Sequence, residues 1–252
     1  MIALITGGSS GMGLEFARQL AAKGYDLILV SNRPDELEQA EAELRGLYPD
    51  RTVTTRCLDL ATTTAADELF EWCPDLPDVL VNDAGLFFFK ELQVEDLPRV
   101  QAMIDLHIVT VTRICILFGA AMKRRGSGRI LNISSMTARI PAPGITIYSA
   151  TKAYLKSFGR SLSYEFKPYG VSVTTVCPAA IATPLYRLSE KQMKMGLAIG
   201  LIRTPQWLVW RALRALFAGR RVISPAFMNV WLPALIALLP GPLIQYLWKK
   251  LK

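Results

Sequence analysis

The chain of 252 residues has few of the residues that mark several common classes of protein. Its single histidine, His107, excludes a metal site built from several histidines, and we expect no metal. The four cysteines are far apart and form no Cys-x-x-Cys pair, which indicates reduced thiols and a cytoplasmic protein. The start, Met1-Ile2-Ala3-Leu4-Ile5, shows no charged segment before its apolar run, so no secretory signal is expected. We find no basic stripe interleaved with aromatics and expect no nucleic-acid partner.

The chain also has a modest fraction of charged residues. Charged residues make up 20% of the chain and hydrophobic residues 51%, which is typical of a folded domain and not of a disordered one. The length suits one large α/β domain with a well-buried core. The formal net charge of +8 favours anionic ligands or anionic lipid surfaces.

Short apolar runs alternate with helical patterns along the chain, with no linker, repeat or low-complexity break. Continuous apolar runs are typical of parallel strands that are buried on both faces. The alternation predicts one α/β domain over residues 1–224, a Rossmann-type doubly wound parallel sheet of seven strands, followed by an apolar helical extension over 225–252. The predicted strands are 2–5, 27–31, 52–57, 79–81, 128–133, 171–177 and 222–224, and the main predicted helices are 14–23, 35–47, 95–125, 148–169 and 205–218.

A glycine-rich turn follows the first apolar run. It reads Thr6-Gly7-Gly8-Ser9-Ser10-Gly11-Met12-Gly13 and leads into a helical pattern. A strand, a glycine-rich turn and a helix start are the layout that binds a dinucleotide pyrophosphate, because backbone can approach the phosphates and the helix N-terminus supplies N–H groups. The alternative is a tight turn that needs glycines for its geometry alone.

The end of the second strand indicates which dinucleotide would bind. Ser31 stands where an acid would hold the ribose hydroxyls of NAD, and Arg33 follows two residues later. A neutral residue with a nearby guanidinium suits a 2′-phosphate, which favours NADP(H) over NAD(H). Alternatively, Arg33 is an ordinary solvated charge. Asp59, after the third strand, would either accept a hydrogen bond from the adenine amino group or cap the next helix.

A tyrosine and a lysine lie one helical turn apart in Tyr148-Ser149-Ala150-Thr151-Lys152. A phenol is a poor acid at neutral pH, with a reference pKa of about 10. An ammonium group beside it favours the phenolate, so this pair can exchange a proton where an isolated tyrosine could not. The spacing alone also occurs by chance on surface helices, and its weight depends on the cofactor motif.

Together these segments resemble the short-chain dehydrogenase/reductase family, over nearly the whole chain. The glycine turn matches the family's Thr-Gly-x-x-x-Gly-x-Gly loop, and Asn82-Asp83-Ala84-Gly85 matches its Asn-x-Ala-Gly. Ser135, Tyr148 and Lys152 match its catalytic set. The resemblance implies that Tyr148 is the general acid/base, that Ser135 orients and polarises the substrate carbonyl, and that Lys152 lowers the tyrosine pKa and holds the nicotinamide ribose.

Two positions depart from the family pattern. His107 stands where the family usually has an asparagine of the proton relay, and Ala179 stands where it often has a glycine. Histidine can also relay protons, so we count it with the catalytic residues, although a lone histidine on an apolar helix is more often a core residue. The residues expected to bind the cofactor are Gly7, Ser9, Ser10, Gly11, Met12, Gly13, Ser31, Asn32, Arg33, Asp59, Leu60, Asn82, Ala84, Gly85, Tyr148, Lys152, Pro178, Ile181 and Thr183.

Two apolar segments bear on the substrate. Leu86-Phe87-Phe88-Phe89 is either core or the wall of an apolar substrate pocket. From Val222 to Trp248 there is no charged residue, and Pro240-Gly241-Pro242 should divide this tail into two short helices. The tail would act as a lid or subunit contact, or it would touch a membrane surface through its aromatic and flanking basic residues.

We therefore predict an NADP(H)-dependent oxidoreductase that interconverts a ketone or aldehyde and an alcohol. Its expected role is reduction of a lipophilic carbonyl compound, such as a keto-lipid or a steroid-like ketone. A 3-oxoacyl-thioester reductase is the alternative within the same class. In a different class, the alternative is a cofactor-binding sensor or scaffold without turnover. The family resemblance also implies a homo-oligomer, either dimer or tetramer. The cysteines indicate the cytoplasm, and the tail, if it does not act as a lid or subunit contact, would associate the protein with a membrane.

Overall fold

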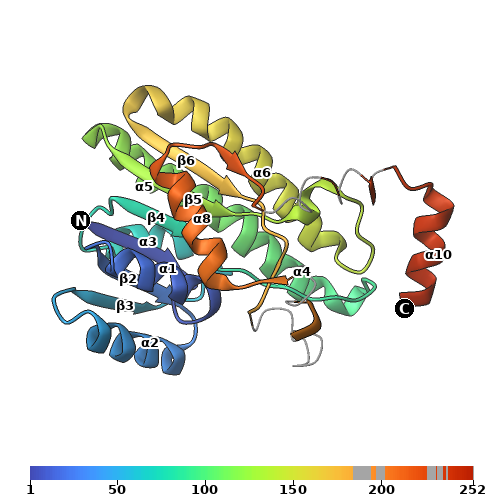
Figure 1. Cartoon of the computed structure of the whole chain (residues 1–252), viewed down its shortest axis with the longest axis horizontal. Coiled ribbons are helices and arrows are strands. Elements are labelled where there is room, and N and C mark those ends of the chain that lie inside the picture. Colours follow the sequence, from blue (N-terminus) through green and yellow to red (C-terminus); the bar gives the residue numbers. More distant parts are fainter. Residues whose placement is uncertain (184–193, 197–201, 226–230, 232–234, 237, 252) are drawn as a thin grey trace.

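A parallel sheet of seven strands forms the centre of the molecule in the computed structural model (Figure 1). The strand order is β3-β2-β1-β4-β5-β6-β9, which confirms the predicted doubly wound sheet. The structure describes residues 1–183, 194–196, 202–225, 231, 235–236 and 238–251. The strands are β1 (Ile2–Thr6), β2 (Asp26–Ser31), β3 (Val53–Cys57), β4 (Val79–Asn82), β5 (Gly128–Ile133), β6 (Val171–Val176) and β9 (Val222–Ile223).

The register of the sheet brings the predicted site segments to one edge. Thr6 at the end of β1 pairs with Val30 of β2 and with Asn82 of β4, and Asn82 pairs in turn with Asn132 of β5. Because β1 lies between β2 and β4, the order reverses at this point. In open α/β sheets, ligands bind at the carboxyl ends of the strands where the order reverses.

Helices cover both faces of the sheet, and each set packs on its own apolar cluster. On one face, buried residues of α1 (Gly11–Ala21), α2 (Pro34–Leu47) and α8 (Pro205–Phe217) pack together. On the other face, α3 (Ala65–Trp72), α5 (Val111–Arg125) and α6 (Thr146–Phe166) do the same. The short strands β7 (Ala180–Ile181) and β8 (Ile202–Arg203) pair outside the main sheet, and the sequence did not predict them.

The long helix predicted over 95–125 is interrupted. It consists of a 3₁₀ turn at Val94–Asp96, then α4 (Leu97–Ile104), a π-helical segment at Asp105–Thr110 and α5. The π-helical segment contains His107, and such segments occur often at functional sites. The stretch Val94–Arg125 is long and apolar enough to cross a membrane, but more than half of its most apolar window is buried in the domain, which is typical of a core helix.

The last helix of the C-terminal tail touches the rest of the protein through a tryptophan. Its last helix, α10 (Gly241–Leu251), begins within the predicted break at Pro240-Gly241-Pro242. The first of the two predicted tail helices, like most of 185–202, lies largely outside the described residues. The ring of Trp248 on α10 lies 6.0 Å from the ring of Phe89, centroid to centroid. The tail helix therefore contacts the loop that follows β4.

Candidate active site

The glycine turn between β1 and α1 is packed so closely that side chains would not fit. A Cβ atom on Gly13 would lie 2.0 Å from the carbonyl oxygen of Gly7, and one on Gly7 would lie 3.0 Å from the backbone of Ala84. Gly7 also has a φ of +70°, which favours glycine. At the start of α1, the side chain of Ser10 makes no capping bond and no acid lies in the first turn. These features fit a dinucleotide pyrophosphate, which would accept hydrogen bonds from the first N–H groups of α1.

The segment after β6 lies against this turn. Thr183 is buried, and its Cγ2 would lie 3.5 Å from a Cβ atom at Gly11. The backbone oxygen of Pro178 accepts a hydrogen bond from the N–H of Met136, and Ile181 is buried in β7. Of the predicted residues in this segment, the structure thus brings Thr183 onto the glycine turn.

At the end of β2, the residues predicted to hold a 2′-phosphate contact Glu36, an acid that was not predicted to belong to the site. The hydroxyls of Ser9 and Ser31 lie 2.9 Å apart, and the hydroxyl of Ser9 also donates to Glu36. Arg33 pairs with the same carboxylate at 2.5 Å, and these contacts lower the pKa of Glu36 against the opposing effect of burial. A 2′-phosphate would have to compete with Glu36 for Arg33, whereas ribose hydroxyls could donate to Glu36.

The predicted adenine end of the site is exposed. An Asp59 carboxylate oxygen accepts hydrogen bonds from the N–H of Ala61 at 3.0 Å and from the side chain of Asn32 at 3.4 Å. The alternative that Asp59 caps the next helix is wrong, because α3 begins at Ala65 with Thr64 before it. The neighbouring Leu60 is buried.

The side chains of Asn82 and Thr6 connect neighbouring segments of the sheet at the edge where the site lies. The side-chain amide of Asn82 donates to that of Asn132 at 2.8 Å inside the sheet. The hydroxyl of Thr6 accepts hydrogen bonds from the N–H groups of Asp83 and Ala84. These contacts hold the Asn-x-Ala-Gly segment against the glycine turn, which places Gly85 beside the catalytic residues.

The three predicted catalytic residues meet at the carboxyl end of β5. Ser135 follows that strand, and Tyr148 and Lys152 lie on α6; all three are buried. The Nζ atom of Lys152 donates to the backbone oxygen of Ile133 at 2.9 Å and lies 5.6 Å from the ring centroid of Tyr148. The hydroxyl of Ser135 accepts hydrogen bonds from the N–H and the hydroxyl of Thr137, so its own hydrogen can be donated to a substrate oxygen.

Two ionisable groups share the floor of this site: Lys152 is buried, and Asp83 is half-buried with one carboxylate oxygen shielded from solvent. Burial lowers the pKa of Lys152 to about 8, although the carboxylate of Asp83 partly offsets this effect. Burial also raises the pKa of Asp83 to about 7, opposed by the charge of Lys152 and by the N–H of Gly13. Each group is therefore the main counter-charge of the other.

His107 is completely buried and both of its ring nitrogens are engaged. Nε2 accepts a hydrogen bond from the N–H of Leu86 at 2.9 Å, which requires that Nδ1 carries the proton and donates to the hydroxyl of Thr151 at 2.9 Å. Thr151 in turn donates to the backbone oxygen of Tyr148. Burial, with a contribution from Lys152, holds the pKa of His107 well below 6.5, so the ring is neutral at pH 7. It connects the loop after β4 to the helix that carries Tyr148.

The phenylalanines after β4 have different environments: Phe88 lies in the core and Phe87 lies at the catalytic tyrosine. Phe88 is buried in a cluster with Met103 and Tyr148. The ring of Phe87 meets that of Tyr148 edge-on, with centroids 5.0 Å apart, whereas Phe89 is 53% exposed. The segment is therefore both core and an apolar wall at the tyrosine. Within the described residues, no three His, Cys, Asp or Glu side chains lie close enough to hold a metal ion.

Three residues of the site were not found from the sequence. Glu36 lies three residues after Arg33, a spacing that predicts contact on a helix. Thr151 lies one turn from Tyr148, which would have indicated contact with its backbone. Asp83 occupies the variable position of the Asn-x-Ala-Gly motif. Nothing in the sequence indicated that its carboxylate lies beside Lys152.

Comparison with known proteins agrees with this geometry. Residues 1–194 match the model of the short chain dehydrogenase family, and the chain belongs to that family. The very-long-chain 3-oxoacyl-CoA reductase of Homo sapiens is 34% identical over 193 residues, and that of Mus musculus is 32% identical over the same length. Each alignment covers 75% of this chain and 62% of the relative, so the chain spans less than two thirds of these relatives.

Solved structures show the same fold. A short chain dehydrogenase/reductase family protein has a TM-score of 0.77 and 30% identity, with 89% of this chain and 94% of that chain covered. A short-chain dehydrogenase from Sphingobium yanoikuyae in complex with NADPH has a TM-score of 0.79 and 25% identity, with 95% and 96% covered. These comparisons and the fit of the glycine turn support a nicotinamide dinucleotide as the cofactor.

Proposed function

We propose that this protein is an NADP(H)-dependent reductase of lipophilic carbonyl compounds, with long-chain 3-oxoacyl thioesters as the favoured substrate class. One observation carries the proposal: Ser135, Tyr148 and Lys152 lie together at the carboxyl end of β5 beside Gly85, where Phe87 lies edge-on to the tyrosine. That arrangement suits a carbonyl group attached to an apolar chain. The names of the most similar curated relatives favour the thioester over the steroid-like ketone within this class.

The roles of the chain's own residues follow from their contacts. Ser135 donates its hydroxyl hydrogen to the carbonyl oxygen and polarises it, while Tyr148 gives that oxygen a proton. The positive charge of Lys152 stabilises the phenolate that remains, because an adjacent cation favours the charged form of an acid. His107 and Thr151 position the backbone of Tyr148. A bound nicotinamide would supply the hydride that reaches the carbonyl carbon.

We keep NADP(H) as the proposed form of the cofactor, although the carboxylate of Glu36 competes with a 2′-phosphate for Arg33. Arg33 supplies the guanidinium for a 2′-phosphate, and the hydroxyls of Ser9 and Ser31 lie beside it. Glu36 opposes this preference, because a carboxylate repels a phosphate and accepts ribose hydroxyls.

A cofactor-binding protein without turnover is the second candidate. It was suggested by His107 at the relay position. Its ring accepts the N–H of Leu86, while Lys152 still donates to the backbone oxygen of Ile133 and Ser135, Tyr148 and Lys152 all lie at the carboxyl end of β5. The geometry therefore favours the enzyme.

We also propose a cytoplasmic homo-oligomer whose tail lies over the site. Ile116 of α5 is 52% exposed and lines a shallow hollow with Phe158 of α6, which suits a subunit contact through these helices. Tyr246 on α10 is exposed, and Lys249 and Lys250 end that helix. The tail would thereby act as an apolar lid that also reaches a membrane surface.

The test is NADPH consumption with 3-oxoacyl thioesters of increasing chain length, alongside ring ketones and short ketones. We expect turnover to rise with apolar length and to disappear in Tyr148→Phe. A preference for short or ring ketones would exclude the proposed substrate class. Bound NADPH with no turnover on any compound would favour the second candidate.

A further inference from the structure

The outer face of α8, together with Arg203 at the end of β8, carries a stripe of arginines and aromatic rings. Arg203, Trp207, Trp210, Arg211, Arg214 and Phe217 follow one another at spacings of one to four residues and form what we call the α8 face. The opposite face of the helix, with Leu208 and Leu213, is buried in the core. The sequence analysis found no basic stripe interleaved with aromatics, and the structure shows that this finding is wrong.

The arginines of this face lie on the rings instead of pairing with acids. The guanidinium groups of Arg203 and Arg211 lie 5.2 and 5.1 Å from the Trp207 ring centroid, and that of Arg214 lies 5.4 Å from Trp210. Among the described residues, none of the three forms a salt bridge with a carboxylate. The rings therefore hold these cations in place, and no carboxylate in the described part of the chain neutralises them.

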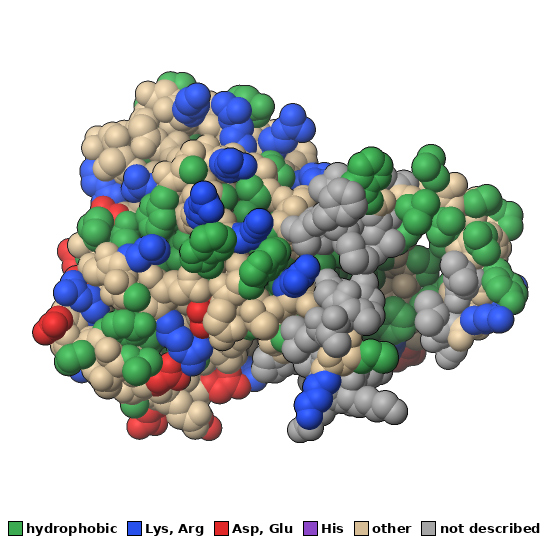
Figure 2. Space-filling view, viewed as in Figure 1, with side chains coloured by type: hydrophobic (Ala, Val, Ile, Leu, Met, Phe, Trp, Pro, Cys, Tyr) green, Lys and Arg blue, Asp and Glu red, His purple; other side chains and the backbone are tan. Residues whose placement is uncertain are grey.

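Among the described residues, the acid that α1 places near this face is already engaged. The nearest helix, α1, carries Glu15, which is buried, pairs with Arg18 and accepts a hydrogen bond from Gln19. Figure 2 shows basic and hydrophobic side chains together over α8, whereas acidic side chains gather at the lower left edge of this view. Trp210 is 51% exposed and Phe217 36%. The α8 face thus combines uncompensated positive charge with exposed aromatic surface.

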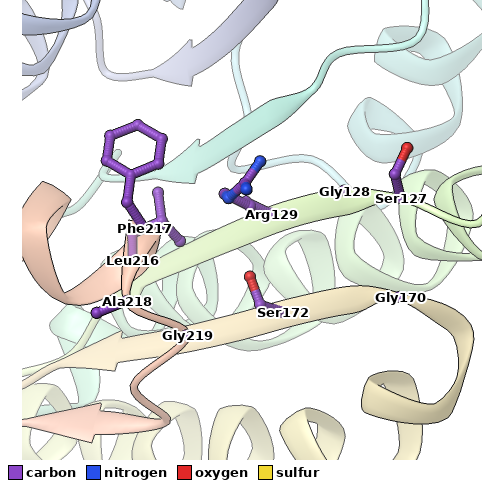
Figure 3. A pocket seen from close by; sticks show the side chains of 9 residues that line it. All are labelled: Ser127, Gly128, Arg129, Gly170, Ser172, Leu216, Phe217, Ala218 and Gly219. Atoms are coloured by element: carbon purple, nitrogen blue, oxygen red, sulfur yellow. The ribbon is translucent and has the colours of Figure 1, made fainter.

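A polar hollow lies at the end of this face. It has a volume of about 340 Å³ and lies where the strands β5 and β6 begin, at the edge of the sheet opposite the catalytic residues. Figure 3 shows Arg129, Ser127 and Ser172 lining it beside Phe217. The guanidinium of Arg129 lies 5.5 Å from the Phe217 ring centroid. A guanidinium with two hydroxyls offers the donors that a phosphate group accepts.

We propose that the α8 face docks on an anionic membrane surface, with the Arg129 hollow taking a lipid headgroup phosphate. Arginine with exposed tryptophan is the composition that binds at a lipid–water interface. A second copy of the chain is a poorer occupant, because a two-fold contact would bring the same unpaired arginines together. The face begins at β8, which pairs with β7 near Thr183, so a docked membrane would lie close to the candidate active site.

The test compares binding of the full chain to sedimenting vesicles of phosphatidylcholine alone and with about 30% phosphatidylserine. A variant with Arg203→Gln, Arg211→Gln and Arg214→Gln loses three charges from the face. The matched control, Arg45→Gln, Arg113→Gln and Arg124→Gln, loses the same net charge elsewhere. Each arginine near a charged bilayer contributes about fivefold in binding, so the face variant should bind roughly a hundredfold more weakly and the control near wild type. Arg129→Gln should weaken binding further.

Different results would overturn the proposal. Equal loss in both triple variants would show a general effect of net charge. Equal binding to neutral and anionic vesicles, unaffected by 0.5 M salt, would assign membrane contact to the apolar tail. Tighter binding to duplex DNA than to vesicles, or a changed oligomeric state in the face variant, would assign the face to nucleic acid or to a second copy. Circular dichroism and thermal unfolding of each variant would confirm that the fold is intact.

Discussion

Replacement of His107 by asparagine tests how this ring supports the site. The chain has no other histidine, so the change removes the only imidazole. The ring is fully buried and hydrogen-bonded to Leu86 and Thr151, each at 2.9 Å. The shorter asparagine would keep at most part of these contacts and leave some of the volume empty. We expect the free energy of unfolding to fall by about 1–3 kcal/mol at pH 7.

The pH dependence of that loss is the more specific result. The folded protein keeps His107 neutral, whereas the unfolded chain binds a proton near pH 6.5. The contribution of this group to stability is therefore complete above pH 6.5 and decreases as the pH falls. For a ring that stays neutral in the folded state, the decrease from pH 7 to pH 5 is about 2 kcal/mol. The asparagine variant has no group at position 107 that titrates in this pH range, so its stability lacks this contribution.

Urea denaturation of both proteins at pH 5, 6, 7 and 8 measures this difference. The other titrating groups, including Asp83, are common to both proteins and cancel in the comparison. We expect the gap in unfolding free energy to narrow as the pH falls from 7 to 5, by at most about 2 kcal/mol. A gap that stays constant with pH would mean that His107 is protonated in the folded protein, and it would refute the assigned tautomer and hydrogen bonds.

Further predictions concern the proposed chemistry. Tyr148→Phe should lower kcat by about a hundredfold or more while the NADPH Kd stays near its original value; retained turnover would contradict the assigned proton donor. Arg33→Ala should weaken NADPH binding by roughly tenfold and leave NADH binding unchanged, and Glu36→Gln should strengthen NADPH binding, both measured by fluorescence titration. Because the pKa of Lys152 is about 8, its charge is lost as the pH rises, and kcat/KM should fall above that pH. A profile that is flat to pH 9.5 would contradict this.

The sheet was predictable because its signals are local. Buried parallel strands are continuous apolar runs, and residues 2–5 and 27–30 show this pattern directly. The glycine turn was predictable for a related reason, since the close approach of Gly13 to Gly7 excludes any side chain. The seven-stranded order then follows from the alternation of strands and helices.

The break in the long helix before β5 could not be predicted from its residues. Nothing in Asp105-Leu106-His107 disfavours an α-helix strongly, and the π-helical segment occurs where His107 must reach both Leu86 and Thr151. Such contacts depend on residues that are distant in sequence. The position of the Asp83 carboxylate beside Lys152 was missed for the same reason.

The cofactor preference could not be predicted from the sequence for a third reason. Arg33 and Ser31 were recognised one by one, but the preference depends on which partner Arg33 selects. Its ion pair with Glu36 is short, although Arg33 itself is mostly exposed, and exposed pairs contribute little to stability. A phosphate could therefore replace the carboxylate at small cost.

The most direct test of the central claim is to follow the hydride. NADPH carrying deuterium on one face of nicotinamide C4 would be incubated with a long-chain 3-oxoacyl thioester and the wild-type protein, with Tyr148→Phe as the control. The account predicts deuterium at the new carbinol carbon of the 3-hydroxy product for one of the two labelled faces, and no labelled product from the control. NADPH that stays bound and unoxidised, or label that appears equally with the control, would contradict the account.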